Sequence, residues 1–216
     1  MDARTKKMVT LAMMAALAYV VMVVIRVPVV LFLKYEPKDV IITIAGFLYG
    51  PVSSLIISIV VGIVEMVTVS DTGWIGMIMN VISSAAFCVT AAVIYKKNHT
   101  LKGAVLGLIS GTVLMTAVML LWNYLITPIY MGYPREAVTS MLLPAFLPFN
   151  LVKAALNSAI TLLLYKPVVS ALRRSGLVEK SSAQEGKTQR NFAMVVGAIF
   201  VIATAVVVIL VLSGKL

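Results

Sequence analysis

Runs of about twenty apolar residues recur along this chain, and short stretches that contain Lys or Arg separate them. Hydrophobic residues make up 61% of the 216 residues and charged residues 12%, and a soluble protein of this length needs a more polar surface. A run of this length crosses a hydrocarbon layer of about 30 Å as a helix. The ten-residue alternation of membrane barrel strands is not evident. The runs therefore predict an all-α integral membrane protein.

The apolar runs predict seven membrane spans. They cover residues 8–25, 38–49, 52–70, 76–95, 103–125, 149–172 and 192–212. The second span is about 18 Å long at 1.5 Å per residue, which is short for a bilayer. The connector 26–39 is apolar, but Pro28 and Pro37 interrupt it. It is expected to form either a lid over a neighbouring pocket or an interfacial anchor, with Lys34 and Tyr35 at the headgroups.

The formal charge of +10 does not indicate nucleic-acid binding, because the basic residues cluster between the apolar runs. Twelve of the 18 Lys and Arg residues lie in the segments 1–7, 96–102 and 166–190. The positive-inside rule then predicts a multi-pass protein of the cell membrane with its N-terminus in the cytoplasm. In this orientation the connector 26–39 and the stretches 70–76 and 127–149 all lie outside.

Small residues recur at helical spacing in two spans. Ala12 and Ala16 form a pair in the first span, and Gly103, Gly107 and Gly111 form a ridge in the fifth. Small residues let a second helix approach closely in lipid. From spacing alone, packing within this chain is favoured for both, over a docking face for a partner protein on the first span.

The stretch 122–153 is too polar to be an ordinary lipid-facing helix. Asn123 and Thr127 are four residues apart and share one helix face, and Tyr130 follows one turn later if the helix continues past Pro128. Asn150 and Lys153 lie three apart at the head of the next span. Polar groups at matching depth on consecutive membrane helices indicate a binding site.

Two further polar residues lie inside spans, where they need protein or water around them. Glu65 is near the end of the third span, and Asn80 is near the start of the fourth. Each is a candidate ligand contact, and each has the alternative of a hydrogen bond within the helix bundle.

The chain carries no recognisable catalytic or metal-binding pattern. HExxH, a serine nucleophile motif and an acidic pair for a metal are not evident in the sequence, so an enzyme is not expected. His99, the single histidine, lies among lysines, and no metal site is predicted. The segment SSAQEGKT has Ser181 where a P-loop has its first glycine, which argues against nucleotide binding.

Four motifs together resemble a known transporter family. They are KKMVTLAMMAALAYVV, FLKYEPKDVIITIAGFLYGP, WNYLITPIYMG and LPFNLVKAALNSAITLLLYKP. In this order they resemble the substrate-binding S components of energy-coupling factor (ECF) transporters, specifically the riboflavin-specific type. The resemblance covers about residues 5–172.

The resemblance implies a six-helix bundle that captures a vitamin from outside a prokaryotic cell. It implies association with a coupling membrane subunit and two ATPase subunits. It assigns Ala12 and Ala16 to contact with the coupling subunit, and Asn123, Asn150 and Lys153 to the vitamin, with the first outer loop closing over the site. The six-helix pattern has no place for residues 192–212. We therefore expect a binding domain at 1–172, a cytoplasmic polar linker at 173–191 and an additional transmembrane helix at 192–216.

Riboflavin chemistry fits the polar residues, with riboflavin as the transported ligand and no cofactor. The Asn150 amide can donate and accept along the uracil-like edge of the flavin, and the Lys153 ammonium can donate to a carbonyl oxygen. Tyr35, Trp74 and Tyr130 could enclose the flat ring. The alternative for Lys153 is snorkelling to lipid headgroups. The alternative functions are an S component for another vitamin or flavin, and a stand-alone secondary transporter, although the matching broken helices of such transporters are not evident.

Overall fold

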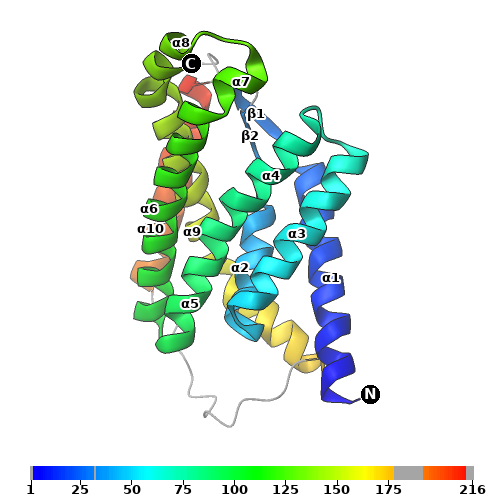
Figure 1. The fold of residues 1–216 in the computed structure, drawn as a ribbon. Coiled ribbons are helices and arrows are strands. Elements are labelled where there is room, and N and C mark those ends of the chain that lie inside the picture. Colours follow the sequence, from blue (N-terminus) through cyan, green and yellow to red (C-terminus); the bar gives the residue numbers. More distant parts are fainter. Residues whose placement is uncertain (1, 32, 178–191, 213–216) are drawn as a thin grey trace.

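The computed structural model describes residues 2–31, 33–177 and 192–212. Its long helices run along a common axis, with residue 2 at one end and a β-hairpin at the other (Figure 1). We call these the N-terminal end and the hairpin end of the bundle. The long elements are α1 (Ala3–Val24), α2 (Lys38–Tyr49), α3 (Pro51–Thr68), α4 (Gly73–Ser84), α5 (Thr90–Lys97), α6 (Leu101–Leu125), α9 (Leu147–Arg174) and α10 (Phe192–Leu212).

Short elements join the long helices at two places. A π-helical turn, Ala85–Val89, connects α4 to α5. At the hairpin end, α7 (Thr127–Met131), α8 (Arg135–Met141) and a second π-helical turn, Leu142–Phe146, connect α6 to α9. Within the described residues, six helical segments are long and apolar enough to cross a membrane, namely Ala3–Val24, Pro51–Thr68, Gly73–Lys97, Leu101–Leu125, Arg135–Arg174 and Val195–Leu212. The predicted helical membrane fold is confirmed.

The short second span is also a helix, and it is enclosed by protein. Ten of the twelve residues of α2 are buried, including Lys38 and Asp39 at its start. The helix packs against α1, α3, α5 and α9. A helix surrounded on all sides by other helices does not need to span the bilayer, since its backbone and side chains contact protein instead of lipid.

The connector 26–39 forms a β-hairpin, which the sequence did not predict. Strand β1 (Val27–Val30) pairs antiparallel with β2 (Leu33–Tyr35). The side chains of Val29, Leu33 and Tyr35 are buried in an apolar cluster with residues of α9 and α10. Tyr35 is therefore enclosed by protein, whereas the anchor interpretation expected a side chain in contact with lipid headgroups. The hairpin covers the end of the bundle, in the position of a lid.

The glycine ridge of α6 packs within the bundle, as predicted. A Cβ atom added to Gly107 would lie 2.7 Å from the carbonyl oxygen of Ala91, and one added to Gly111 would lie 2.6 Å from that of Phe87. These contacts are with backbone atoms of the neighbouring segment, which cannot move aside as a flexible side chain can. Gly107 and Gly111 thus set how closely the two segments approach.

For the small residues of α1, the interpretation from spacing is wrong. The buried face of α1 consists of Thr10, Met14, Ala18 and Met22. Ala12 and Ala16 are exposed on other sides of the helix. Two of these four inward residues, Met14 and Met22, are methionines, whose long side chains fill space where α1 packs against α2 and α3.

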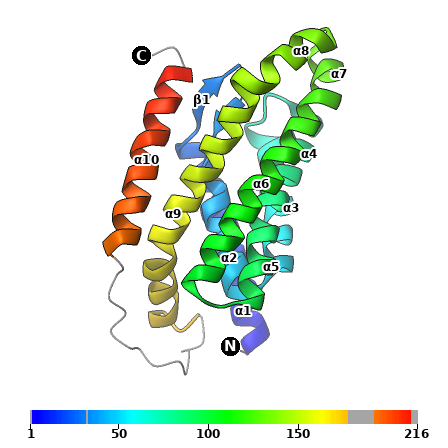
Figure 2. The same ribbon diagram turned by 90° about the vertical axis from the view of Figure 1, so that its left-hand side faces the viewer.

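Helix α9 continues to Arg174, two residues into the predicted linker, and most of that linker, residues 178–191, lies outside the described residues. Helix α10 confirms the predicted seventh apolar helix. It lies alongside α9 and reaches the hairpin end of the bundle (Figure 2), and it packs against α9 and β1.

Candidate ligand-binding site

Two adjoining cavities lie beneath the hairpin end of the bundle. The first, here called the polar cavity, has a volume of about 50 Å³. Its walls come from the hairpin, α3, α4, α6 and α9, and are formed by Arg26, Leu33, Lys34, Glu36, Glu65, Thr72, Met79, Asn80, Ser83, Met119, Phe149, Asn150 and Lys153. Four of the predicted site residues, from three helices, are therefore brought together here.

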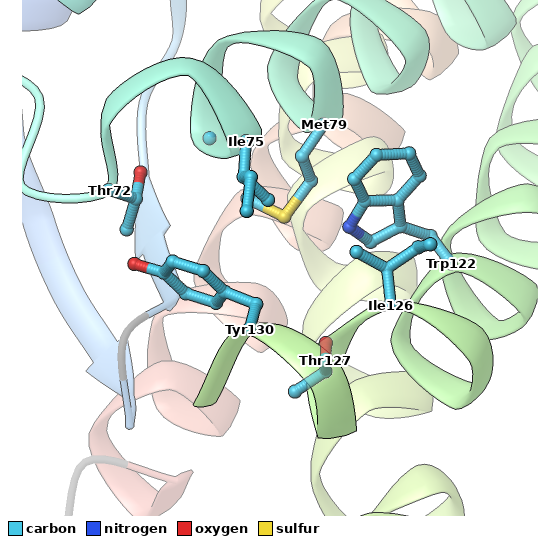
Figure 3. Close-up of a pocket in the computed structure, with 8 residues that line it drawn as sticks. Thr72, Ile75, Met79, Trp122, Ile126, Thr127 and Tyr130 are labelled. Carbon is cyan, nitrogen blue, oxygen red and sulfur yellow. The ribbon is translucent and has the colours of Figure 1, made fainter. Parts of the chain in front are cut away.

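The second cavity, here called the aromatic cavity, has a volume of about 10 Å³. It is lined by Thr72, Ile75, Gly76, Met79, Trp122, Ile126, Thr127 and Tyr130. Figure 3 shows the side chains of Ile75, Met79 and Trp122 pointing toward one another, and the ring of Tyr130 extending toward Thr72. Because Thr72 and Met79 line both cavities, the two spaces share a wall. A ligand with an apolar ring and a polar edge would find both kinds of surface here.

Asn150 and Lys153 occupy the first turns of α9, and both are buried. The Nδ2 atom of Asn150 donates to the carbonyl oxygen of Phe146 at 2.8 Å, which fixes the orientation of the amide. The Nζ atom of Lys153 lies 3.9 Å from Oδ2 of Asp39 on α2. With 6% of its surface exposed, Lys153 does not snorkel away from the bundle.

Asp39 lies at the centre of a buried polar network. Its Oδ1 accepts a hydrogen bond from the Ser84 hydroxyl at 2.5 Å, and its Oδ2 accepts one from Nδ2 of Asn157 at 3.3 Å. Asn157 Oδ1 in turn accepts a hydrogen bond from the Tyr35 hydroxyl at 3.1 Å. Tyr35 thereby connects the hairpin to α9, and it is not among the residues that line the two cavities.

Glu65 is engaged by partners within the protein. Its Oε2 accepts a hydrogen bond from Nζ of Lys38 at 2.5 Å, and its Oε1 accepts one from Nδ2 of Asn80 at 2.8 Å. Lys38 also lies 3.1 Å from Glu36, which pairs with Nε of Arg26 at 2.9 Å. The hydrogen bonds within the bundle that were considered for Glu65 and Asn80 are thus present, and both residues still line the polar cavity.

Sequence reasoning missed four members of this charged group: Arg26, Glu36, Lys38 and Asp39. Together with Glu65 and Lys153 they give three cations and three carboxylates. Burying charge in a membrane protein is costly unless each charge is paired. The sequence feature that indicates this charged group is the motif EPKD, where two carboxylates and an ammonium occur within four residues beside a span.

Asn123 in the last turn of α6 and Thr127 at the start of α7 contact each other, although the helix breaks at Ile126 between them. Thr127 Oγ1 donates to Asn123 Oδ1 at 2.9 Å, and Asn123 Nδ2 donates to the carbonyl oxygen of Met119 at 2.7 Å. Thr127 and Tyr130 line the aromatic cavity, with Asn123 fully buried beside them. Trp74 is 64% exposed and lines neither cavity, so its role stays a prediction.

The hairpin is tied to the loop between α3 and α4. Lys34 forms an ion pair with Asp71, and Nη1 of Arg26 donates to the carbonyl oxygen of Val69 at 2.6 Å. The hydrogen bond from Lys34 and its positive charge lower the pKa of Asp71 below its ordinary value. The carboxylate form is therefore favoured at neutral pH, and the tie is lost only in acid, at a pH below that ordinary value of 3.8.

Comparison with known proteins identifies the family. The model of the substrate-specific component of ECF transporters matches residues 6–165. This chain belongs to that family. The match spans most of the bundle, from α1 into α9, and leaves α10 outside. The predicted family is thus confirmed.

Relatives of this S component cover most of its length. Riboflavin transporter RibU of Staphylococcus aureus (strain TCH60) is 28% identical over 79% of this chain and 94% of its own. Riboflavin transporter FmnP of Bacillus subtilis (strain 168) is 26% identical over 75% of this chain and 91% of its own. A solved S component of a bacterial ECF transporter is 29% identical with a TM-score of 0.68, over 79% of this chain and 99% of the other.

No group of three His, Cys, Asp or Glu side chains that could hold a metal occurs among the described residues of this S component. The carboxylates of the polar cavity are instead paired with Lys and Arg. The relatives above are transporters rather than enzymes. The chemistry that the site offers is hydrogen bonding and ring contact, which is the chemistry of binding.

Proposed function

We propose that this S component binds riboflavin at the polar and aromatic cavities and delivers it to the cell interior as part of an ECF importer. The observation that carries the proposal is the juxtaposition of Asn150 and Lys153 with an aromatic, apolar space in a chain whose relatives are named riboflavin transporters. No catalytic step by this chain is part of the proposal.

The flavin has an apolar tricyclic ring, a uracil-like edge and a polyol chain. In our proposal the amide of Asn150 and the ammonium of Lys153 bind the uracil-like edge, where acceptors and a donor alternate. The rings of Tyr130 and Trp122 contact the flavin ring. The polyol chain then lies near the Glu65 and Asn80 side of the polar cavity, which holds both donors and acceptors.

Entry of the vitamin requires movement of the hairpin. Cavities that hold a ligand of drug size have volumes of about 300–1,000 Å³, whereas the two cavities measure about 50 and 10 Å³. The hairpin is joined to the bundle by the Lys34–Asp71 pair and by the Tyr35–Asn157 hydrogen bond. Separation of these contacts would enlarge the polar cavity on its outer side, so we propose that the hairpin is the lid.

The proposed topology places the N-terminus in the cytoplasm of a prokaryotic cell and the hairpin outside. The proposed partners are a coupling membrane subunit and two ATPase subunits. Ala12 and Ala16 are exposed near the middle of α1, which supports a docking face for the coupling subunit. Residues 1–172 then form the binding unit and residues 192–216 an added anchor, joined by a cytoplasmic linker.

The test is calorimetric titration of the purified protein in lipid nanodiscs with riboflavin, flavin mononucleotide, thiamine and folate. We expect riboflavin to bind most tightly, because the cations of the polar cavity already have carboxylate partners and do not form a free phosphate site. Tighter binding of thiamine, folate or the phosphate ester would contradict the proposal. Uptake by proteoliposomes that contain this chain alone would instead favour a secondary transporter.

A further inference from the structure

A third cavity lies between the membrane helices α6, α9 and α10, away from the ligand site. Its volume is about 390 Å³. Its floor is made of small, buried side chains such as Ala159 and Ala198, and its rim of exposed ones such as Ile109, Val113 and Val201. It is thus a lateral crevice that opens toward the surrounding hydrocarbon. Figure 2 shows α9 with α10 on one side and α6 on the other.

One wall of the crevice is formed by α10, which lies outside the part of the chain that the family model matches. The match ends at residue 165, and α10 supplies Gly197, Ala198 and Val201. A Cβ atom added to Gly197 would have nothing within 4 Å, so the space beside this residue is open. The crevice therefore does not belong to the vitamin site and depends on the added helix.

We propose that the lateral crevice binds one acyl chain of an anionic phospholipid whose phosphate is held at the N-terminal end of the bundle. A cavity of about 150 Å³ holds one benzene molecule, so about 390 Å³ gives room for roughly fifteen carbon atoms of a chain. Side chains that line an unfilled gap lose dispersion contacts, and a bilayer supplies hydrocarbon chains to fill it.

Two lysines select the headgroup, and they lie on the faces of α6 and α9 that line the crevice. Lys102 precedes Ile109 by seven residues and Val113 by eleven, which places it on the crevice face of α6, about 10 Å from Ile109 along the helix. Lys166 follows Ala159 by seven residues and Ala155 by eleven, which places it on the crevice face of α9. Both lysines are exposed, with Lys102 in the first turn of α6 and Lys166 in the last third of α9. These ends of the two helices lie toward the N-terminal end of the bundle (Figure 2).

Two cations at the end of an apolar crevice suit a lipid phosphate. Each Lys or Arg near an anionic headgroup strengthens its binding by roughly fivefold. A neutral zwitterionic lipid with the same chains would gain the packing in the crevice but little of this attraction. The structure thus fits a phosphatidylglycerol-like lipid better than phosphatidylcholine.

The experiment is native mass spectrometry of the full chain titrated with phosphatidylglycerol or phosphatidylcholine of identical chains. We expect the wild type to prefer phosphatidylglycerol at least tenfold, and Lys102→Gln with Lys166→Gln to remove most of that preference. The control Lys97→Gln, an exposed lysine at the end of α5, should retain it. Equal affinity of the wild type for the two lipids, or an equal loss in the control, would overturn the proposal.

A second pair of variants tests the crevice itself. Gly197→Leu should fill the space and weaken binding of both lipids at least fivefold, whereas Ala203→Leu, at an exposed position of α10 that does not line the crevice, should not. Unchanged binding in Gly197→Leu would overturn the proposal. A dimer that Gly197→Leu dissociates would also overturn it, because the crevice would then hold a second copy of the chain. Neither readout involves the vitamin, so the result is independent of the proposed transport function.

Discussion

The Asp39 carboxylate and the Lys153 ammonium lie 3.9 Å apart in the interior of the bundle, on α2 and α9. Lys153 lines the polar cavity, and Asp39 stands behind it, held by Ser84 and Asn157. The pair connects the proposed ligand contact to the most deeply buried helix of the protein. A lysine in such a position has a fixed location before any ligand binds, which lowers the entropic cost of binding.

The first prediction concerns the two proposed ligand contacts. Asn150→Ala and Lys153→Ala should each weaken riboflavin binding by about 5- to 150-fold, because each removes a hydrogen bond worth about 1–3 kcal/mol in a desolvated site. Calorimetric titration measures the loss, with Lys97→Ala as the control on an exposed lysine. Wild-type affinity in both variants would remove these residues from the site.

The second prediction concerns the support of Lys153 by Asp39. Asp39→Asn should lower the stability of the protein by about 3–5 kcal/mol, because it leaves the Lys153 ammonium buried without its countercharge. The double variant Asp39→Asn with Lys153→Met should recover part of that loss. Thermal unfolding in one detergent measures all four members of the cycle, and strictly additive effects would show that the two residues are not coupled.

The third prediction concerns Glu65. Glu65→Gln should destabilise the fold by about 3–5 kcal/mol, because it leaves the buried group with more cations than carboxylates and Lys38, which is 2% exposed, shares Glu36 with Arg26. The same change at Glu136, an exposed residue in the first turn of α8, is the control and should have little effect. Similar unfolding temperatures for the two variants would contradict the paired arrangement of the cluster.

The fourth prediction compares two glycines in membrane helices. Gly111→Ala should destabilise the protein by about 1–3 kcal/mol, because its Cβ would lie 2.6 Å from the backbone oxygen of Phe87. Gly197→Ala has open space around the new atom and should be neutral or gain up to about 1 kcal/mol of helix propensity. Equal effects in a denaturant titration would argue against close packing between α6 and the α4–α5 segment.

The fifth prediction concerns coupling to the proposed partner. Ala12→Leu with Ala16→Leu should abolish energised uptake and leave riboflavin binding intact, because both alanines are exposed on α1. Ala18→Leu, on the buried face of the same helix, is the contrast and should impair folding and binding together. Binding and uptake are measured on the same preparations. Uptake at the wild-type level in the double variant would exclude this face as the docking surface.

Much of the site could be predicted from the sequence, because a polar residue in an apolar run requires a protein partner or a ligand. Asn150, Lys153, Glu65 and Asn80 were found in this way and line one cavity. The charged residues of the EPKD motif were missed because a stretch next to a span is also typical of the headgroup region. Only the contacts of Lys38 with Glu65 and of Asp39 with Lys153 show that the motif belongs to the buried charged group and not to the headgroup region.

The sequence by itself determined the seven long apolar helices, because the length and polarity of a run decide whether it can cross a bilayer, and both are local properties. It did not predict the short helices α7 and α8, which lie in the stretch 127–149 that was expected to connect two spans. It could not determine which face of α1 is buried, since Ala12 and Ala16 have a spacing suited to inward or outward packing alike. It could not predict the hairpin, whose strands are held by pairing with each other and by the apolar cluster on α9 and α10. Those features depend on contacts between residues far apart in the chain, and such contacts exist only once the helices have assembled.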